Sequence, residues 1–248
     1  MKCLENYPLI HIAETDSTNN YLSGLCDREP VAEFTTMQAD FQTAGKGQRG
    51  NSWEAEKGKN LLFSFVLYPI FLEARRQFVL SQIVSLAVKE ELDQWTDGIS
   101  IKWPNDIYWG DKKICGMLIE NDLAGMHIGR SIIGIGLNIN QEQFVSDAPN
   151  PISLKQVTGC EHDRTTILDG ILQRTATYYA EVQQEGSTRI ARRYLQSLFR
   201  REGMHRYADA DGEFMAQVVD VEPDGHFILE DENQRLRRYV FKEVQYIL

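Results

Sequence analysis

A glycine-rich, positively charged segment at residues 42–53 constrains this chain more than any other feature. Gly45, Gly47 and Gly50 alternate with Lys46 and Arg49. Glycines let the backbone bend sharply and let a ligand approach it closely, and the two cations can hold a phosphate or a carboxylate. The segment therefore predicts a loop that closes over an anion, although a lysine-glycine segment is also common in plain surface turns.

The same glycines match the G-x-G-x-x-G pattern of dinucleotide-binding proteins, but the residues that follow argue against that fold. In those proteins a helix begins directly after the glycines, and its N-terminus holds the pyrophosphate. Here the polar residues 51–60 lead into an apolar run from Leu61 to Tyr68, which is typical of a loop followed by a strand. The Walker pattern also fails, because no Lys-Ser or Lys-Thr pair follows the glycines.

Charge and cysteine content restrict the class of protein further. The 248 residues carry a net charge of −10, which argues against general affinity for nucleic acid or an anionic membrane. The four cysteines form no C-x-x-C pair and the five histidines are scattered, so we predict neither a disulfide framework nor a metal site. Because no signal peptide and no apolar run of about 18 residues is evident, we expect a cytoplasmic protein with no membrane partner.

Hydrophobic periodicity predicts a core of both strands and helices. The predicted strands are residues 34–39, 61–68, 99–103, 114–121 and 131–140, and the predicted helices are 74–95, 166–184 and 187–200. A short helix should also follow Asp16 or Ser17, either of which could cap it, and Ser187 should cap the last helix. Residues 145–165 should be rich in loops.

After Gly203 the sequence predicts only short strands, at residues 214–221, 226–229, 236–241 and 244–247. About 45 residues of strand alone bury too little surface to be stable by themselves. We therefore expect two domains, a main domain at 1–200 and a small barrel-like domain at 201–248 that docks on it.

A second polar segment, Lys102-Trp-Pro-Asn-Asp106, ends a predicted strand and is followed by a turn and by Lys113-Ile-Cys-Gly116. Pro, Asn and Asp are common in turns, so the segment alone is weak evidence for a site. A hairpin, however, would bring the two segments side by side and place Lys113 near Asn105. A half-buried lysine without a permanent acid partner is costly, and such a lysine indicates an anionic ligand such as a phosphate.

Two further segments are open to a structural or a functional interpretation. Ser17-Thr-Asn19 could be only a helix cap, and Gly134-Ile-Gly-Leu-Asn138 could be only a central strand. Glycines weaken a strand unless something packs closely against it, and Asn138 needs partners, for which an adenine edge is one candidate. No serine-hydrolase or zinc-protease motif is present. Cations, amides and hydroxyls suit electrostatic stabilisation of a reacting phosphoryl group.

In order and spacing, these segments resemble biotin–protein ligases. The matching pieces are Asp16-Ser-Thr-Asn19, Gln42 to Gly50 with Trp53, Lys102 to Asp106 with Lys113 to Gly116, and Gly134 to Asn138. The resemblance implies an α+β catalytic core like that of class II aminoacyl-tRNA synthetases and lipoate ligases, with a mixed sheet flanked by helices and an SH3-like C-terminal domain. Because the match begins near residue 10, we expect the form that lacks an N-terminal DNA-binding domain.

The resemblance also implies a reaction in two steps. The carboxylate of biotin attacks the α-phosphorus of ATP, which is accompanied by Mg²⁺, and biotinyl-5′-AMP and pyrophosphate are formed. A lysine of a biotin carboxyl carrier protein or domain then attacks the mixed anhydride, which gives an amide and AMP. The family commonly dimerises through a sheet edge, so a homodimer is possible, but no sequence feature decides it.

Residues in the matching positions take roles from the same resemblance. Lys113 is the principal catalytic cation, between the biotin carboxylate and the α-phosphate, and Lys46 assists it. The implied biotin-binding residues are Ser17, Thr18, Asn19, Gln42, Gly45, Lys46, Gly47, Gln48, Lys113 and Gly116. The implied ATP-binding residues are Arg49, Trp53, Lys102, Asn105, Asp106 and Asn138.

The chain departs from the family's usual loop, Gly-Arg-Gly-Arg-x-Gly, at two positions. Lys46 keeps the charge but loses the bidentate guanidinium, and Gln48 has no charge. Two alternatives remain open. A lipoate or octanoate ligase would use the same core, although the histidine near the glycines of those families is missing here. A non-catalytic biotin sensor is favoured only by Gln48.

Overall fold

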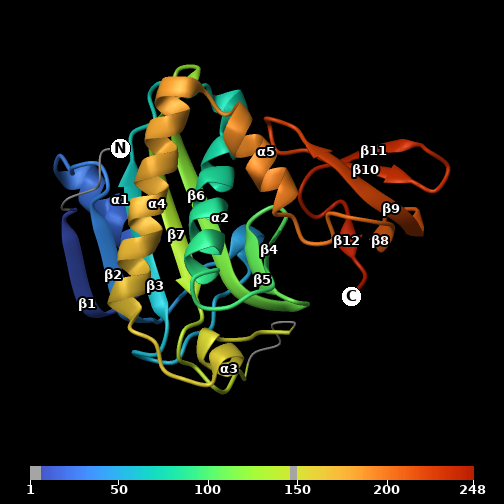
Figure 1. The fold of residues 1–248 in the computed structure, drawn as a ribbon. Coiled ribbons are helices and arrows are strands. Elements are labelled where there is room, and N and C mark those ends of the chain that lie inside the picture. Colours follow the sequence, from blue (N-terminus) through green and yellow to red (C-terminus); the bar gives the residue numbers. More distant parts are fainter. Residues whose placement is uncertain (1–6, 146–149) are drawn as a thin grey trace.

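The computed structural model describes residues 7–145 and 150–248, apart from the side chain of Arg49. It contains a seven-stranded sheet in the order β1-β2-β3-β7-β6-β5-β4 (Figure 1). Its strands are β1 (Leu9–Thr15), β2 (Thr36–Gln42), β3 (Leu61–Leu67), β4 (Ile99–Lys102), β5 (Asp106–Trp109), β6 (Lys112–Ala124) and β7 (His127–Leu137). The β1–β2 pair is parallel and the other neighbouring pairs are antiparallel. The mixed sheet confirms the predicted α+β class.

Helices cover both faces of this sheet, because alternate side chains of a strand point to opposite faces. The helices are α1 (Thr18–Arg28), α2 (Phe78–Leu92), α3 (Leu154–Thr158), α4 (Arg164–Glu185) and α5 (Thr188–Gln196), with short 3₁₀ turns η1 (Gln48–Gly50) and η2 (Ala74–Arg76). Phe63 and Phe65 of β3 belong to the large core under α2 and α4, whereas Val66 packs with Leu22 of α1. Figure 1 shows α2 and α4 lying together over one face of the sheet.

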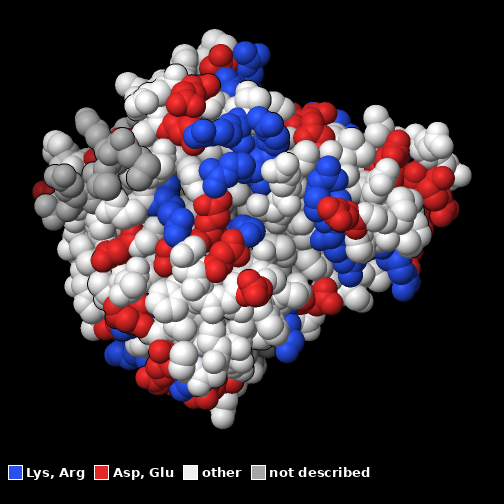
Figure 2. All heavy atoms as spheres, viewed as in Figure 1, with Lys and Arg blue, Asp and Glu red and all other residues white. Residues whose placement is uncertain are grey.

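The surface over α2, α4 and α5 carries mixed charges. Figure 2 shows acidic and basic side chains beside one another on this face. Two of the ion pairs among these helices are Glu90–Arg193 and Glu181–Arg189, and the first of them ties α2 to α5. In the part of the chain that the structure describes, no helix has the length and apolar character needed to cross a membrane.

The C-terminal domain is a five-stranded antiparallel sheet, in agreement with the SH3-like expectation. Its strands are β8 (His205–Asp209), β9 (Gly212–Val221), β10 (Phe227–Asp231), β11 (Leu236–Tyr239) and β12 (Gln245–Tyr246). It docks through Trp103, whose ring stacks on Phe227 with the centroids 5.0 Å apart and whose Nε1 donates to the Gly225 carbonyl at 2.9 Å. The strands of the two sheets fall on either side of residues 200 and 201 in the sequence. The domain boundary between these two residues remains a prediction.

Three strands were not expected from the sequence, namely β1, β5 and β8. β1 is an edge strand whose residues are all exposed or only partly buried, so its hydrophobic alternation is weak. β5 has only four residues. Only Asn105 separates it from Pro104, and this segment was interpreted as a turn. Short and edge strands have a weak hydrophobic pattern of their own, and their pairing with neighbouring strands is not recorded in that pattern.

The helix boundaries differ from the expected ones mainly in their caps. The segment at 145–165 contains α3, which begins with a capping box formed by Ser153 and Gln156. Asp163 caps α4 by accepting hydrogen bonds from the backbone of the first turn. Ser17 and Ser187 occupy N-cap positions, but neither side chain makes a capping hydrogen bond. The expected capping by Ser187 is therefore wrong, because its hydroxyl accepts from Arg76 instead.

Candidate functional site

The floor of the site is the face of the central sheet toward α1, where the strands carry small residues. Gly136 of β7 lies opposite Gly116 of β6. A Cβ atom at Gly136 would lie 2.4 Å from Trp53 Cε2, and one at Gly134 would lie 2.2 Å from Asn19 Oδ1. Both distances are far below van der Waals contact, so any side chain at either position would displace the neighbouring side chain. The expectation that something packs closely on the glycines of this strand is confirmed.

A cavity of about 790 Å³ lies over this floor. Its walls come from the start of α1, the glycine-rich loop, β4 to β6, the loop after β7 and the C-terminal domain. The cavity brings together most of the predicted site residues, namely Ser17, Thr18, Asn19, Gln42, Lys46, Gly47, Gln48, Trp53, Lys102, Asn105, Asp106, Lys113, Gly116 and Asn138.

Two predicted residues are absent from the residues described as lining this cavity. Gly45 supports the loop from behind, because its carbonyl accepts from the backbone N–H of Trp53 at 2.9 Å. A Cβ at Gly45 would lie only 2.7 Å from the Trp53 carbonyl oxygen. Arg49 lies in η1, and its side chain is outside the described part of the structure.

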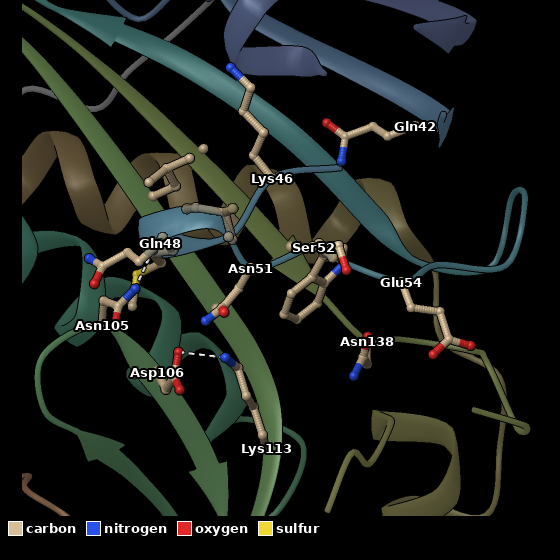
Figure 3. A pocket seen from close by; sticks show the side chains of 18 of the residues that line it. Gln42, Lys46, Gln48, Asn51, Ser52, Glu54, Asn105, Asp106, Lys113 and Asn138 are labelled. Carbon is tan, nitrogen blue, oxygen red and sulfur yellow. Dashed lines mark hydrogen bonds and ion pairs between the residues drawn. The ribbon is translucent and has the colours of Figure 1, made fainter. Parts of the chain in front are cut away.

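The glycine-rich loop is a small hairpin that lies across the cavity. Lys46 forms an antiparallel bridge with Ser52, and the N–H of Gly47 donates to the Asn51 carbonyl at 2.6 Å. Figure 3 shows Asn51 pointing toward Asp106 and Lys113, whereas Lys46 points away from them. This loop-then-strand arrangement, and not a loop followed by a long helix, agrees with the exclusion of a dinucleotide-binding fold.

The ammonium of Lys46 does not face the cationic end of the cavity. It donates instead to the side-chain oxygen of Asn20 in α1, and the residue is exposed. The expectation that Lys46 acts beside Lys113 as a second catalytic cation is therefore not met by this geometry. An exposed lysine is free to bind the nearest polar group, and here that group belongs to α1 rather than to the anion-binding end.

Lys113 lies where the hairpin argument predicted. Asp106 of β5 pairs with Gly116 of β6, and the Lys113 ammonium lies against Gly116 and 5.6 Å from the centre of the Trp53 ring. One expectation is wrong, however, because Lys113 does have an acid partner. Its Nζ lies 2.8 Å from Asp106 Oδ1, with both side chains about a quarter exposed (28% and 22%). The carboxylate holds the ammonium at the cavity and lowers the cost of burying it.

Lys102, at the same end of the cavity as Lys113, is a half-buried lysine that lacks an acid partner in the described part of the chain. Its Nζ donates to the Tyr108 hydroxyl at 2.9 Å and lies 5.0 Å from the centre of the Tyr246 ring. Among the residues that the structure describes, no carboxylate forms an ion pair with it. Burial lowers the pKa of Lys102, and the nearby negative charge of Asp106 opposes that effect only in part. Lys102 is thus a costly half-buried cation of the kind that indicates an anionic ligand.

The opposite end of the cavity is neutral and polar. Gln42 Oε1 accepts from the backbone N–H of Thr18 at 2.7 Å, and its amide oxygen is therefore turned toward α1. Ser17 and Thr18 add two hydroxyls, and both residues are almost fully buried. Figure 3 shows Gln42 on the far side of the pocket from Lys113. A ligand that spans the cavity would meet amides and hydroxyls at one end and cations at the other.

Two buried polar atoms at the cavity have no partner among the described residues. Asn138 Nδ2 donates to the Ile152 carbonyl at 3.1 Å, but Asn138 Oδ1 is unsatisfied. The indole N–H of Trp53 is also buried and unsatisfied. Buried polar atoms normally find partners, so a ligand with both a donor and an acceptor would complete this part of the site.

Several lining residues were missed by the sequence analysis. Among them are Asn51, Tyr108, Phe144, Pro151 and Phe241. Asn51 follows Gly50 inside the conspicuous loop and could have been included on that ground. Phe241 comes from the C-terminal domain, and nothing in its local sequence indicates that it reaches this cavity.

One cluster of potential metal ligands lies outside the cavity. Glu222, Asp224 and His226 of the C-terminal domain come together in the described structure. The guanidinium of Arg238 binds both carboxylates. Their negative charge is therefore already offset, and the arrangement is a poor site for a cation.

Comparison with known proteins supports one family. Residues 12–138 match the model of the Biotin/lipoate A/B protein ligase family. The bifunctional ligase/repressor BirA of Bacillus subtilis is 28% identical over 86% of this chain and 66% of its own length. The biotin–[acetyl-CoA-carboxylase] ligase of Paracoccus denitrificans is 28% identical over 74% of this chain and 78% of its own.

A solved structure extends the match to both domains. The biotin protein ligase of Aquifex aeolicus in complex with biotin and ATP is 26% identical, with a TM-score of 0.80 over 97% of this chain and 99% of that one. The chain spans between 53% and 66% of the length of the bacterial bifunctional ligase/repressors it matches.

Proposed function

The chain belongs to the Biotin/lipoate A/B protein ligase family, and on that premise we propose that it is a biotin–protein ligase. It activates biotin with ATP to biotinyl-5′-AMP and then transfers the biotin to a lysine of a biotin carboxyl carrier protein or domain. The proposal is supported by relatives named as biotin ligases and by a similar structure that holds biotin and ATP.

The observation that carries the proposal is a single cavity with two chemically different ends. Ser17, Thr18 and Gln42 offer hydroxyls and an amide to a neutral polar ring such as a cyclic urea. Lys102 and Lys113 offer positive charge to a carboxylate and a phosphate. The volume of about 790 Å³ lies within the range usual for small-molecule sites.

Lys113 is the group that makes the first step possible. The carboxylate of biotin and the α-phosphate of ATP repel each other, and the ammonium offsets that repulsion as negative charge develops in the transition state. A carboxylate oxygen attacks the α-phosphorus, and the bond to the bridging oxygen of pyrophosphate breaks. Asp106, 2.8 Å from Lys113, keeps the ammonium directed at the reacting atoms.

The glycine-rich hairpin protects the product of that step. Biotinyl-5′-AMP is a mixed anhydride, which water would hydrolyse, and a closed site excludes water. Gly47 and Gln48 of the hairpin line the cavity. In the second step the amine of the carrier lysine attacks the acyl carbon, AMP leaves with the bonding electrons, and the amine loses a proton to solvent.

The nucleotide is held by groups on the cationic side of the cavity. Lys102 attracts the phosphates, Asn105 and Trp53 form part of the wall, and Asn138 Oδ1 offers an unused acceptor to the adenine amino group. Mg²⁺ is usually bound by one or two carboxylates together with substrate phosphates. Asp106 already pairs with Lys113, so it would supply at most one ligand, and the phosphates and water would supply the others. A bound Mg²⁺ would offset the charge of the phosphates.

The polar end of the cavity favours biotin over lipoate or octanoate. A dithiolane ring or an alkyl chain would leave the hydrogen-bonding atoms that Ser17, Thr18 and Gln42 turn toward the cavity unpaired, and burying unpaired polar atoms is costly. A sensor without activity would have no use for Lys102 and Lys113, two cations at one end of the cavity. Gln48 lines the cavity, so its lack of charge weakens the hold on the intermediate without removing the catalytic lysine.

A homodimer would use an open sheet edge. β1 is an edge strand of the large sheet, and edge strands present unpaired backbone groups to other chains. The other edge is partly covered, because the N–H of Ile101 in β4 donates to the Ser197 carbonyl at 2.9 Å.

Biotin-dependent exchange of labelled pyrophosphate into ATP tests the proposed function. We expect exchange with biotin but not with lipoate or octanoate, and the intact mass of a co-incubated carrier domain should rise by one biotinyl group. Exchange that requires lipoate would identify the other branch of the family. Biotin binding without exchange or transfer would identify a sensor.

The pKa of Lys102 gives a pH dependence for ATP use. Burial lowers this pKa, so Lys102 loses its charge at a lower pH than an exposed lysine does. Because the phosphates favour the charged form, ATP binding takes up a proton, and the KM for ATP should rise as the pH increases through the Lys102 pKa. The measurement is the KM for ATP against pH. Lys102→Met should have a higher KM and lack this rise, and an unchanged pH profile in that variant would remove Lys102 from the phosphate site.

A further inference from the structure

Behind the neutral end of the cavity, hydrogen bonds connect Thr18 to Glu120 through two other side chains. Thr18 Oγ1 lies 2.7 Å from Ser64 Oγ, and Ser64 Oγ lies 2.6 Å from Asn19 Oδ1. Asn19 Nδ2 then donates to Glu120 Oε2 at 2.6 Å. Ser64 is fully buried and Thr18 and Asn19 nearly so, whereas Glu120 reaches the surface. We call Thr18, Ser64, Asn19 and Glu120 the relay.

The chemistry of these groups fixes the direction of each hydrogen bond. A carboxylate accepts hydrogen bonds, and a carbonyl oxygen does the same. The Asn19 amide nitrogen is therefore turned toward Glu120 and the Leu118 carbonyl, which lie 2.6 and 3.4 Å away. Its oxygen is turned toward Ser64, and that oxygen can only accept. The single proton of Ser64 must go to Asn19.

The direction of the remaining bond follows from the same count of protons. With its own proton used, Ser64 Oγ can only accept from Thr18 at 2.7 Å. The competing acceptor for the Thr18 proton, Gln42 Oε1, is farther away at 3.1 Å and already accepts from the Thr18 backbone at 2.7 Å. The Thr18 proton is therefore directed inward, to Ser64 Oγ or to Gln42 Oε1, and with either acceptor the hydroxyl presents a lone pair to the cavity.

We propose that Glu120, Asn19 and Ser64 are positioning residues that hold the Thr18 hydroxyl as an acceptor, so that the cavity selects a ligand with an N–H at this end. This inference rests on the proposed function, in which that donor is a ureido N–H of biotin. Gln42 complements it, because its amide oxygen is taken by Thr18 and its nitrogen is left to donate to the ureido oxygen. Asn19 thus acts through Thr18, whereas the sequence analysis placed it in contact with the ligand.

Gly134 shows that the fold makes room for the relay. A Cβ atom at this position in β7 would lie 2.2 Å from Asn19 Oδ1 and 2.9 Å from its Cγ. Any side chain there would expel the Asn19 amide from its place between Ser64 and Glu120. The glycine is thus needed for the relay as well as for the cavity floor.

The test compares biotin with two cyclic carbamate analogues, each of which has an oxygen in place of one ureido N–H. In the wild type, calorimetry should show that at least one analogue binds about a hundredfold more weakly than biotin does. In that analogue, a lone pair of the ring oxygen would face a lone pair of the Thr18 hydroxyl. In Ser64→Ala, Thr18 is free to turn its proton toward the ligand. The preference for biotin over that analogue should therefore narrow by about tenfold.

Ser131→Ala is the matched control. Ser131 is also fully buried in the same sheet, but its hydroxyl has no hydrogen-bond partner among the described residues. This variant should keep the wild-type preference. If Ser64→Ala loses affinity for biotin and for the analogue to the same degree, Ser64 has only a structural role and the inference is overturned. An unchanged preference of Ser64→Ala for biotin over the analogue would overturn it as well.

Glu120→Gln tests the same idea without changing the core. Glu120 is exposed, so the variant should fold, and its amide can donate as well as accept, which releases the fixed direction of Asn19. The preference of Glu120→Gln for biotin over the analogue should narrow several-fold. A preference equal to that of the wild type would count against the relay. Failure of the wild type to bind biotin would refute the proposed function itself, before any variant is made.

Discussion

Replacing Lys113 by alanine should lower biotin-dependent pyrophosphate exchange by about a thousandfold, which corresponds to about 4 kcal/mol of transition-state stabilisation. The ammonium lies at the cationic end of the cavity, against Gly116 and 2.8 Å from Asp106. Without it, the carboxylate and the α-phosphate approach each other with no compensating charge, and Asp106 adds a further repulsion. The loss should appear mainly in kcat, because the charge matters most where the new bond forms.

Lys112→Ala is the control for this variant. Lys112 is the preceding residue of β6 and is exposed, and it does not line the cavity. It should retain full exchange activity. Both variants should melt at nearly the wild-type temperature, since each removes a side chain that is at least partly exposed. Near-normal turnover of folded Lys113→Ala would contradict the mechanism.

A single methyl group at Gly136 should raise the KM for ATP by about fivefold to about 150-fold, as expected from about 1–3 kcal/mol of overpacking. The added Cβ would lie 2.4 Å from Trp53 Cε2 and 2.6 Å from its Nε1. Because Gly136 is part of a paired strand, the indole must move, and the space above it belongs to the ligand. The KM for ATP measured by pyrophosphate exchange is the readout.

A double-mutant cycle separates this clash from a general loss of structure. If the Gly136→Ala defect acts through the indole, adding it to Trp53→Ala should have little further effect. Gly24→Ala in α1 is the matched control, because a Cβ there meets no atom within 4 Å. Fully additive effects of Gly136→Ala and Trp53→Ala would show that the glycine acts in some other way.

The main elements of the fold could be predicted because their signals are local. The buried strand at Leu61–Leu67 and the long helix α4 follow from continuous hydrophobicity and from helical periodicity. The edge strand β1 is stabilised by pairing with β2 across about twenty intervening residues, and nothing within its own seven residues reports that pairing. By contrast, α3 was within reach, because Ser153 and Gln156 have the spacing of a capping box.

The site could be predicted where it follows from one hairpin and not where it depends on distant segments. Lys113 was placed correctly beside Gly116, since both lie on the hairpin of β5 and β6. Its pairing with Asp106 was missed, because a β-bulge between Ile107 and Tyr108 shifts the register. The direction of Lys46 depends on α1, and Phe241 reaches the cavity only because the C-terminal domain docks.

Trp103 lies in the chain between Lys102 and Asn105, and both of these neighbours line the cavity. Its own ring stacks on Phe227 of the C-terminal domain. The segment from Lys102 to Asn105 thus contributes two residues to the cavity and also connects the two domains. A substitution in the small domain that displaces Phe227 should therefore also disturb residues that line the cavity. Exchanging that domain between homologues should succeed only when the incoming domain presents an equivalent surface to Trp103.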